Sequence, residues 1–196
     1  MSGGIGAGKT TVARILESLG CVVLDSDKMA HEELREPDVV DVLRSWWGES
    51  VFTSAGEVDR GKLAGIVFDD ANELKRLEGL LYPRLHRRRE HIFARLATDD
   101  CVRGFVLDAP KLHEAGVDKI CDVVIFVAAA DDVRARRVAA TRGWSEAEWR
   151  RRENLQIPLD TKRALADHVV VNGHSDIGLL RPEIERIFDS VLRFFS

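Results

Sequence analysis

The sequence is marked first by what it lacks. No apolar run approaches the roughly 18 residues that suggest a membrane-spanning helix, and no charged-then-apolar leader opens the chain. The three cysteines are widely spaced with no CxxC pair, and the six histidines show no HExxH or other metal spacing. We therefore expect no membrane span, no secretory signal and no structural metal. Cys21 and Cys121 border apolar runs, so we expect buried free thiols in a reducing compartment.

An excess of basic charge is also absent. The 29 lysines and arginines are outnumbered by 33 aspartates and glutamates, which gives a formal net charge of −4. General binding of nucleic acid needs a basic face, so we expect no nucleic-acid partner. A chain of 196 residues that is 45% hydrophobic can bury one sizeable core. We expect a cytoplasmic monomer.

What the sequence does contain is a phosphate-binding loop near its beginning. Residues 3–10 read GGIGAGKT, which satisfies GxxxxGK[ST], and an apolar, helix-forming run follows. Glycines let consecutive backbone N–H groups surround a phosphate, and the helix N-terminus attracts the same anion. A lysine here reaches the β- and γ-phosphates, and the next hydroxyl is the expected Mg²⁺ ligand. We predict that ATP binds to Gly4, Gly6, Ala7, Gly8, Lys9, Thr10 and Thr11, with Thr10 on the metal.

The strand that should precede this loop is not evident. Such a loop normally joins a buried parallel strand to a helix, yet only Met1 and Ser2 precede the first glycine. A missing central strand would leave a gap of about 4.8 Å and unpaired backbone groups on both neighbours. We therefore expect the first strand to be missing and the true start to lie upstream. The chain as written is expected to be poorly stable and weakly active.

Strand and helix patterns alternate along the rest of the chain. Short apolar runs that favour strands occupy residues 21–24, 105–107, 123–127 and 169–171. Helical patterns occupy residues 9–19, 37–47, 70–97, 131–141, 145–155 and 176–195. This alternation predicts an α/β fold with a doubly wound parallel sheet, of the P-loop NTPase type.

Two helical segments interrupt the alternation. We predict a single domain with a core at about 1–28, 102–140 and 160–196, an acceptor-binding helical insertion at about 29–100 and a lid at about 141–159. A kinase needs one segment to grip the acceptor and one to close over the donor phosphates and expel water.

Carboxylates follow two of the predicted strands. Asp25 and Asp27 come directly after one strand and Asp108 ends another, which places them at the edge where ligands bind in open α/β sheets. A carboxylate there can orient an acceptor hydroxyl and take its proton. Asp108 could hold the hydration shell of Mg²⁺. The alternative is that Asp25 or Ser26 caps the following helix, and that Asp108 also serves as a cap.

Arginines are concentrated in two places. Arg137 and Arg142 are candidates for binding the transferring phosphoryl group, because guanidinium forks match phosphate oxygens. We expect most of the other arginines near them to lie on solvated helix faces, namely Arg134, Arg136, Arg150, Arg151 and Arg152. The run Arg84, Arg87, Arg88 and Arg89 either reaches an anionic acceptor or forms an exposed helix surface. Trp46 and Trp47 are expected to pack the helical insertion.

The motifs together resemble the dephospho-CoA kinase family, in which a TGGIGSGKS loop is followed by DxD. Residues 107–114, LDAPKLHE, are similar to that family's PLLFE-like segment. Arg137, Arg142-Gly143 and the spacing from Arg152 to Gln156 resemble its lid, and residues 166–172 resemble its ADxVIxN strand.

The resemblance implies that the γ-phosphate of ATP moves to the 3′-hydroxyl of the ribose of dephospho-CoA, with Mg²⁺. It makes Asp27 the catalytic base, with Lys9 and Arg142 also catalytic. It assigns acceptor binding to Asp25, Asp27, Glu114 and Arg137. The chain departs from the family pattern where Lys111 and His113 replace apolar residues, where Tyr82 replaces a His and where Ser2 replaces a Thr.

Two other interpretations remain open. A different P-loop kinase for a nucleotide or another small molecule would keep the loop and the lid, although not the DSD sequence or the long insertion. A truncated paralogue would bind nucleotide weakly or bind only a partner. Intact Lys9, Thr10 and Asp27 argue against the second interpretation.

Overall fold

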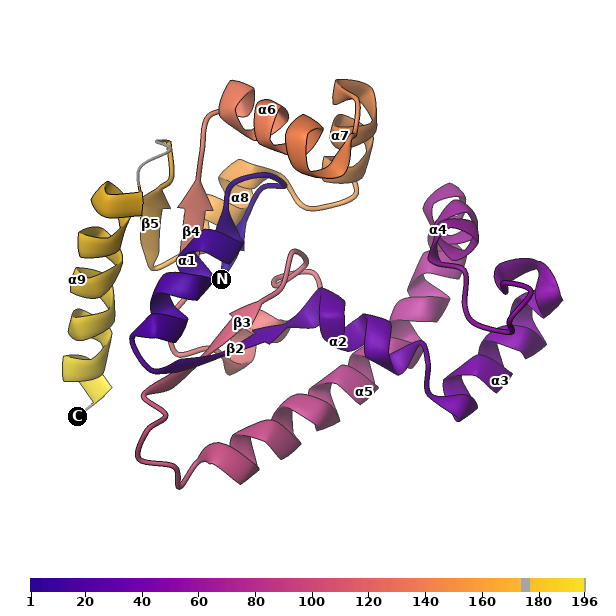
Figure 1. Ribbon diagram of the computed structural model, residues 1–196, viewed down its shortest axis with the longest axis horizontal. Coiled ribbons are helices and arrows are strands. Elements are labelled where there is room, and N and C mark those ends of the chain that lie inside the picture. The colour runs from indigo at the N-terminus through magenta and orange to yellow at the C-terminus, as the bar shows by residue number, and fades with distance from the viewer. Residues whose placement is uncertain (174–176, 196) are drawn as a thin grey trace. The chain divides into compact units, whose positions relative to one another are not determined.

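The computed structural model describes residues 1–173 and 177–195, which form two compact units. Unit 1 comprises Met1–Asp25 and Asp99–Ser196, and unit 2 comprises Ser26–Thr98. All of the named strands belong to unit 1, while unit 2 is helical apart from one isolated bridge, Phe52 to Val58 (Figure 1).

The strands of unit 1 pair in parallel, as the alternating pattern predicts. Two ladders form, with strand orders β1-β4-β5 and β2-β3. The strands are β1 (Ser2–Gly3), β2 (Cys21–Asp25), β3 (Gly104–Asp108), β4 (Ile125–Ala128) and β5 (His168–Val171).

The prediction that the first strand is missing is wrong. Ser2 is the register partner of Phe126 and Gly3 that of Val127, so a two-residue β1 pairs with β4. The Met1 ammonium group donates a hydrogen bond of 2.6 Å to the carbonyl of Leu107 in β3. The first three residues therefore connect the two ladders at the position where a longer strand was expected. Two residues are too few to show a sequence period, which is why the strand has no recognisable pattern.

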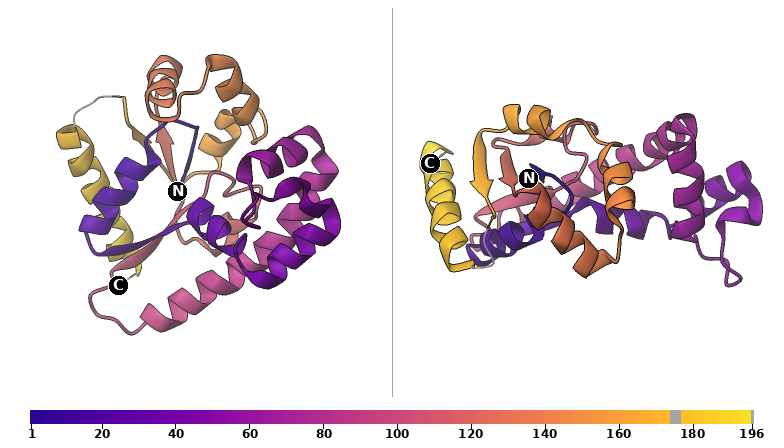
Figure 2. Two further views of the ribbon diagram at one scale, coloured as in Figure 1. Left: turned by 45° about the vertical axis from the view of Figure 1, so that its right-hand side comes forward. Right: turned by 90° about the horizontal axis from the view of Figure 1, so that it is seen from above.

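Helices α1 (Lys9–Ser18) and α9 (Ile177–Phe195) contact each other and enclose the main core of unit 1 (Figure 2). This core combines apolar side chains of both helices with strand residues such as Val106, Val127 and Val170. The remaining helices of the unit are η2 (Val117–Ile120), α6 (Asp131–Arg142), α7 (Glu146–Glu153) and α8 (Leu159–Ala164). Helix α8 was not predicted.

Two predicted boundaries in unit 1 need correction. The strand predicted at 123–127 begins only at Ile125, because the Val124 N–H is bonded to the Asp167 carboxylate at 2.7 Å. The helix predicted at 145–155 ends at Glu153. For the helix predicted at 176–195, Asp176 lies outside the described residues.

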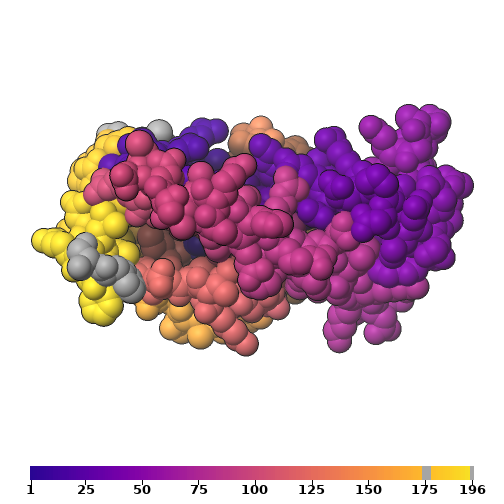
Figure 3. Space-filling model, turned by 90° about the horizontal axis from the view of Figure 1, so that it is seen from below, coloured from indigo at the N-terminus to yellow at the C-terminus, as the bar shows by residue number. Residues whose placement is uncertain are grey.

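Unit 2 consists of α2 (Ser26–Glu33), α3 (Pro37–Trp47), η1 (Gly48–Val51), α4 (Arg60–Asp69) and α5 (Ala71–Leu96). Its core is built around Val39, Leu43 and Val51. Trp46 and Trp47 pack against this core and contact each other edge to face, which confirms their predicted packing role. Atoms of α5, in magenta, lie at the surface of the face shown in Figure 3. Helices α2 and α4 were not predicted as separate elements.

The cysteines are free thiols. Cys21 is buried, and desolvation raises the pKa of its thiol to about 11, which leaves it unreactive near neutral pH. Cys121 is only half-buried, so the predicted burial holds for Cys21 but not for Cys121. Among the described helices, none is both long and apolar enough to cross a membrane.

Candidate active site

The phosphate loop lies between β1 and α1, as its sequence predicts. Gly6 and Gly8 have φ values of +82° and +90°, which residues with a Cβ adopt only under strain. The N–H of Ala7 donates to the Gly4 carbonyl at 3.2 Å, which closes a turn within the loop. Helix α1 begins at Lys9, so the N–H groups of its first turn lie next to the loop and suit an anion.

Lys9 and Thr10 occupy the positions that the motif requires. The Lys9 ammonium group donates to the carbonyls of Gly3 and Gly4, at 3.1 and 3.3 Å. These bonds place the charge of Lys9 beside the backbone at the start of the loop. Thr10 is exposed at the first turn of α1, so its hydroxyl is accessible to a ligand.

Asn172 and Arg137 hold the middle of the loop. The carbonyl of Ala7 accepts a hydrogen bond from Asn172 Nδ2 at 3.0 Å and one from Arg137 Nη1 at 3.4 Å. Arg137 also donates to the Asn172 carbonyl at 3.1 Å. Arg137, predicted to bind the acceptor, is thus placed against the loop. Asn172 follows β5 directly, and only its place in the family-like ADxVIxN segment singled it out in the sequence.

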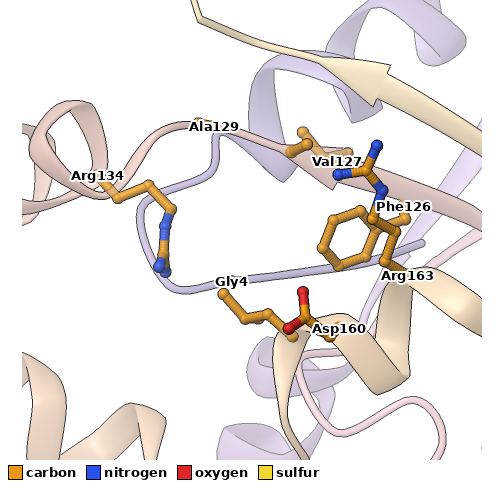
Figure 4. Close-up of a pocket in the computed structure, with 9 residues that line it drawn as sticks. Gly4, Phe126, Val127, Ala129, Arg134, Asp160 and Arg163 are labelled. Carbon is orange, nitrogen blue, oxygen red and sulfur yellow. The ribbon is translucent and has the colours of Figure 1, made fainter.

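Arg134 is buried beside the start of the loop. Arg134 is only 2% exposed, so the prediction of a solvated helix face is wrong for this arginine. The prediction holds for Arg136, whose side chain is 75% exposed. Figure 4 shows Arg134 reaching toward the loop beside Gly4, on the wall of a pocket of about 160 Å³ that residues of β4 and α8 also line. Of the loop glycines, this pocket includes Gly4 alone.

Asp25 and Asp108 are register partners at the carboxyl ends of β2 and β3. Asp25 is exposed. Asp27 is exposed in the first turn of α2, which belongs to unit 2. The sequence prediction that Asp25 and Asp108 share one sheet edge therefore agrees with the strand register.

The residues present fit a Mg²⁺ ion that is bound with ATP. Within residues 1–173 and 177–195 no group of three or more His, Cys, Asp or Glu side chains could form a protein cage for a metal. Mg²⁺ does not need one, because it keeps several waters and is bound by one or two protein oxygens plus substrate phosphates. The exposed hydroxyl of Thr10 and the adjacent carboxylates of Asp25 and Asp108 supply oxygen atoms of this kind.

Glu114 is one of the polar groups that surround the buried Lys162. Its Oε1 accepts the N–H of Ile157 at 2.9 Å and lies 3.5 Å from the Lys162 ammonium nitrogen. Lys162 is fully buried and also donates to the Pro110 carbonyl at 2.6 Å and to Gln156 Oε1 at 2.7 Å. Glu114 therefore joins the loop after β3 to the segment that follows α7. No sequence pattern pointed to Lys162, since a basic residue in a short helix normally suggests exposure.

Arg142 is exposed at the end of α6, where its guanidinium carbon lies 4.8 Å from the centre of the Trp144 ring. Arg152 approaches the same ring, at 4.3 Å. Both cations are thus placed over one indole in the predicted lid. His113, one of the departures from the family pattern, has a buried imidazole, and its Nδ1 lies 3.3 Å from the Asp118 carboxylate.

The basic run of α5 forms ion pairs inside unit 2. Arg84 donates to Glu33 at 2.8 Å and, through both terminal nitrogens, to Asp38. Arg88 pairs with Glu32 and Glu33, and Arg89 is buried. An exposed helix surface therefore describes Arg87 but not Arg84, Arg88 or Arg89.

The comparisons with known proteins agree with the loop and the fold. Residues 1–176 match the family model described as dephospho-CoA kinase. The curated dephospho-CoA kinase of Aquifex aeolicus is 35% identical over 195 residues, covering 98% of this chain and 96% of that protein. That of Thermobifida fusca is also 35% identical, over 90% of this chain and 87% of that protein.

Two solved structures are also similar. The crystal structure of TT1252 from Thermus thermophilus has a TM-score of 0.82 and 35% identity, over all of this chain and 95% of that one. The fold is shared as well with the dephospho-CoA kinase from Campylobacter jejuni, at a TM-score of 0.70 and 22% identity over all of this chain and 96% of that one. By its family match and its curated relatives, the chain belongs to the dephospho-CoA kinase family.

Proposed function

We propose that this kinase transfers the γ-phosphate of ATP to the 3′-hydroxyl of the adenosine ribose of dephospho-CoA, giving CoA and ADP. The observation that carries the proposal is the family match over residues 1–176, which begins at a phosphate loop with Lys9 and Thr10 in place. The phosphate loop by itself is common to many NTPases, whereas the match to this family model extends over most of the chain.

In the proposed reaction a bond forms between the ribose 3′-oxygen and the γ-phosphorus, while the bond from that phosphorus to the β,γ-bridging oxygen breaks. ADP leaves with that electron pair, and the hydroxyl proton passes to the Asp27 carboxylate. Lys9 offsets the charge that develops on the β- and γ-phosphates, and Arg142 provides a second cation for the transferring group. Mg²⁺, held through Thr10 and the hydration shell beside Asp108, would neutralise phosphate charge.

The acceptor is assigned to a separate part of the chain. We assign dephospho-CoA to the helical insertion at about 29–100, with Asp25 orienting the hydroxyl, and we assign closure over ATP to the lid at about 141–159. Asp25 supports this, because it is exposed at the sheet edge and precedes Asp27 by two residues. Glu114 and Arg137 bond to other parts of unit 1, so their contribution to acceptor binding is better described as shaping the site.

The experiment that tests the proposal is an acceptor panel at saturating ATP and Mg²⁺. We expect phosphate transfer to dephospho-CoA and none to nucleoside monophosphates or shikimate, with a Lys9→Ala protein as the inactive control. Transfer to a nucleotide in place of dephospho-CoA would favour another P-loop kinase. ATP binding without transfer to any acceptor would favour a paralogue that only binds nucleotide.

A further inference from the structure

We propose that Arg134 and Glu153 are positioning residues that fix the start of the phosphate loop by holding both backbone polar groups of Ile5. The inference rests on the proposed function, because it assumes that the loop holds the phosphates of ATP. Neither residue is assigned a role in the proposed transfer.

The contacts form a closed set around one loop residue. Glu153 Oε1 accepts the N–H of Ile5 at 3.2 Å, and Arg134 Nη1 donates to the Ile5 carbonyl at 3.3 Å. The same two side-chain atoms, Nη1 and Oε1, bond to each other. Arg134 is 2% exposed and the Glu153 side chain 15%, so water competes little for these bonds.

The side chain of Ile5 is held in the same place. It packs with Val138 of α6 and Trp149 of α7 in a small buried cluster. Ile5 is therefore fixed by both its backbone and its side chain, from the two helices that carry Arg134 and Glu153.

Gly4 allows the close approach that these contacts need. A Cβ at Gly4 would lie closer to Arg134 Nη1 than real Cβ atoms come to any neighbour, and 3.1 Å from Glu153 Oε1. The glycine therefore leaves room for the ion pair beside the backbone, in addition to any room that it leaves for phosphate.

The loop has little regular structure on its N-terminal side, so the contacts to Ile5 can order it. Strand β1 has only two residues and its pairing ends at Gly3, while helical structure begins again at Lys9. The segment between them contains three glycines, which order at a high entropic cost. Holding Ile5 before ATP arrives means that less of this ordering has to accompany binding, which is the benefit of preorganisation.

A buried ion pair can also be merely structural, so the test must separate the two roles. Replacing both partners by apolar residues of similar size often leaves stability unchanged, because no unpaired charge remains. The double variant Arg134→Met/Glu153→Leu leaves no unpaired charge, so it should still fold. Its melting temperature should fall, because the Ile5 N–H and carbonyl lose their partners, and it should bind ATP more weakly. We expect its Kd for ATP, measured by titration without acceptor, to rise about ten-fold.

Asp131→Asn is the matched control. Asp131 is the other carboxylate partner of Arg134, at 2.7 Å, and its second ion pair is with the exposed Arg150 of α7, away from the loop backbone. Its substitution should leave the Kd for ATP within about two-fold of wild type. Glu153→Gln keeps an oxygen acceptor for the Ile5 N–H, so it should bind ATP more tightly than Glu153→Leu.

The inference is overturned if the folded double variant binds ATP as tightly as wild type does, or if Asp131→Asn weakens ATP binding as much as the double variant does. If the double variant does not fold, equal ATP affinities of Glu153→Gln and Glu153→Leu overturn it instead. Wild-type protein that binds ATP but does not phosphorylate dephospho-CoA would overturn the proposed function alone, because the variants are compared by their ATP binding and not by transfer.

Discussion

Asp25 and Asp108 are paired in register at the carboxyl ends of two adjacent parallel strands. The two carboxylates therefore extend from neighbouring backbone positions at one sheet edge. The proposed reaction nevertheless assigns them to different ligands. Asp25 is assigned to the acceptor and Asp108 to the hydration shell of Mg²⁺. The two Asp→Asn substitutions can therefore be compared directly, since each removes one charge from nearly the same place.

The loss of activity caused by each substitution should be overcome by raising the concentration of a different ligand. Asp108→Asn should raise the Mg²⁺ concentration needed for half-maximal activity, whereas Asp25→Asn should raise the KM for dephospho-CoA. We expect shifts of about ten-fold, in line with the loss of one charged hydrogen-bonding group. Steady-state kinetics with Mg²⁺ and acceptor varied independently measures both. If both variants respond only to Mg²⁺, Asp25 is a metal-shell residue and its assignment is wrong.

Asp27 should be essential for turnover and not for ATP binding. Asp27→Asn keeps the shape of the side chain but removes the proton acceptor, so turnover should fall by about 10² or more. The affinity for ATP should stay close to wild type. Single-turnover kinetics, which report the chemical step, are the appropriate measurement. Retention of most of the turnover under those conditions would exclude Asp27 as the base.

Lys9→Ala should abolish transfer, because it removes the loop's own positive charge from the β- and γ-phosphates. Thr10→Ala should instead raise the Mg²⁺ requirement. In this structure Lys9 bonds to the carbonyls of Gly3 and Gly4, so its loss also removes two contacts inside the loop. Lys9→Arg serves as the control that keeps the charge. Normal turnover of Lys9→Ala at ordinary ATP concentrations would show that the loop is not the nucleotide site.

Sequence patterns predicted the elements whose signals are local. The helix at 37–47 was predicted to the residue, because Pro37 begins it and Gly48, at φ +60°, ends it. The strands at 21–24 and 105–107 were each predicted to within one residue at either end, since apolar runs with a following aspartate mark them. Such signals depend only on neighbours along the chain.

The features that were missed depend on partners that are distant in the sequence. Arg134 is buried because Glu153, 19 residues later, supplies the opposite charge. Lys162 is buried because a carbonyl 52 residues earlier accepts a hydrogen bond from its ammonium group. Strand β1 exists because β4 offers register partners more than 120 residues away. No local period carries this information, so the sequence predicted the phosphate loop but not the burial of Arg134 and Lys162.

Lys162 should make the free energy of unfolding depend on pH in the alkaline range. Burial lowers the pKa of its ammonium group below the ordinary 10.5, with Glu114 opposing the shift. Between the lowered pKa and 10.5 the unfolded chain keeps a proton that the folded chain has released, so this group's contribution to stability rises with pH in that window. Below this pH window Lys162 is protonated in both the folded and the unfolded chain, so the folded state bears the full free-energy cost of burying the charge.

Lys162→Met removes this titration and leaves the Pro110 and Gln156 acceptors without their donor. It should destabilise the protein at neutral pH by about 2–3 kcal/mol. The difference in unfolding free energy between wild type and variant should then widen as the pH rises toward 10.5. Denaturant titrations at several pH values measure it, with Lys119→Met at an exposed lysine of unit 1 as the control. A difference that narrows with pH would contradict the direction of the shift.

The short first strand should depend on Gly3. Its φ of +142° lies in the region that residues with a Cβ rarely adopt, and a Cβ there would lie 2.5 Å from the backbone oxygen of Val127. Gly3→Ala would therefore push β1 away from β4, since the neighbouring atom is backbone and cannot rotate aside. We expect a loss of at least about 2 kcal/mol, together with weaker ATP binding because β1 leads directly into the phosphate loop.

Gly65→Ala provides the matched control, because Gly65 lies within α4 and a Cβ there meets nothing within 4 Å. That change should be neutral or stabilise the protein by up to about 1 kcal/mol, as expected for alanine in a helix interior. Thermal melts and ATP titrations of the two variants against wild type decide the matter. The contrary result is that Gly3→Ala has the same melting temperature as Gly65→Ala and binds ATP as tightly as wild type does. In that case the pairing of Ser2 and Gly3 with β4 does not hold the loop in place, and β1 has no part in ATP binding.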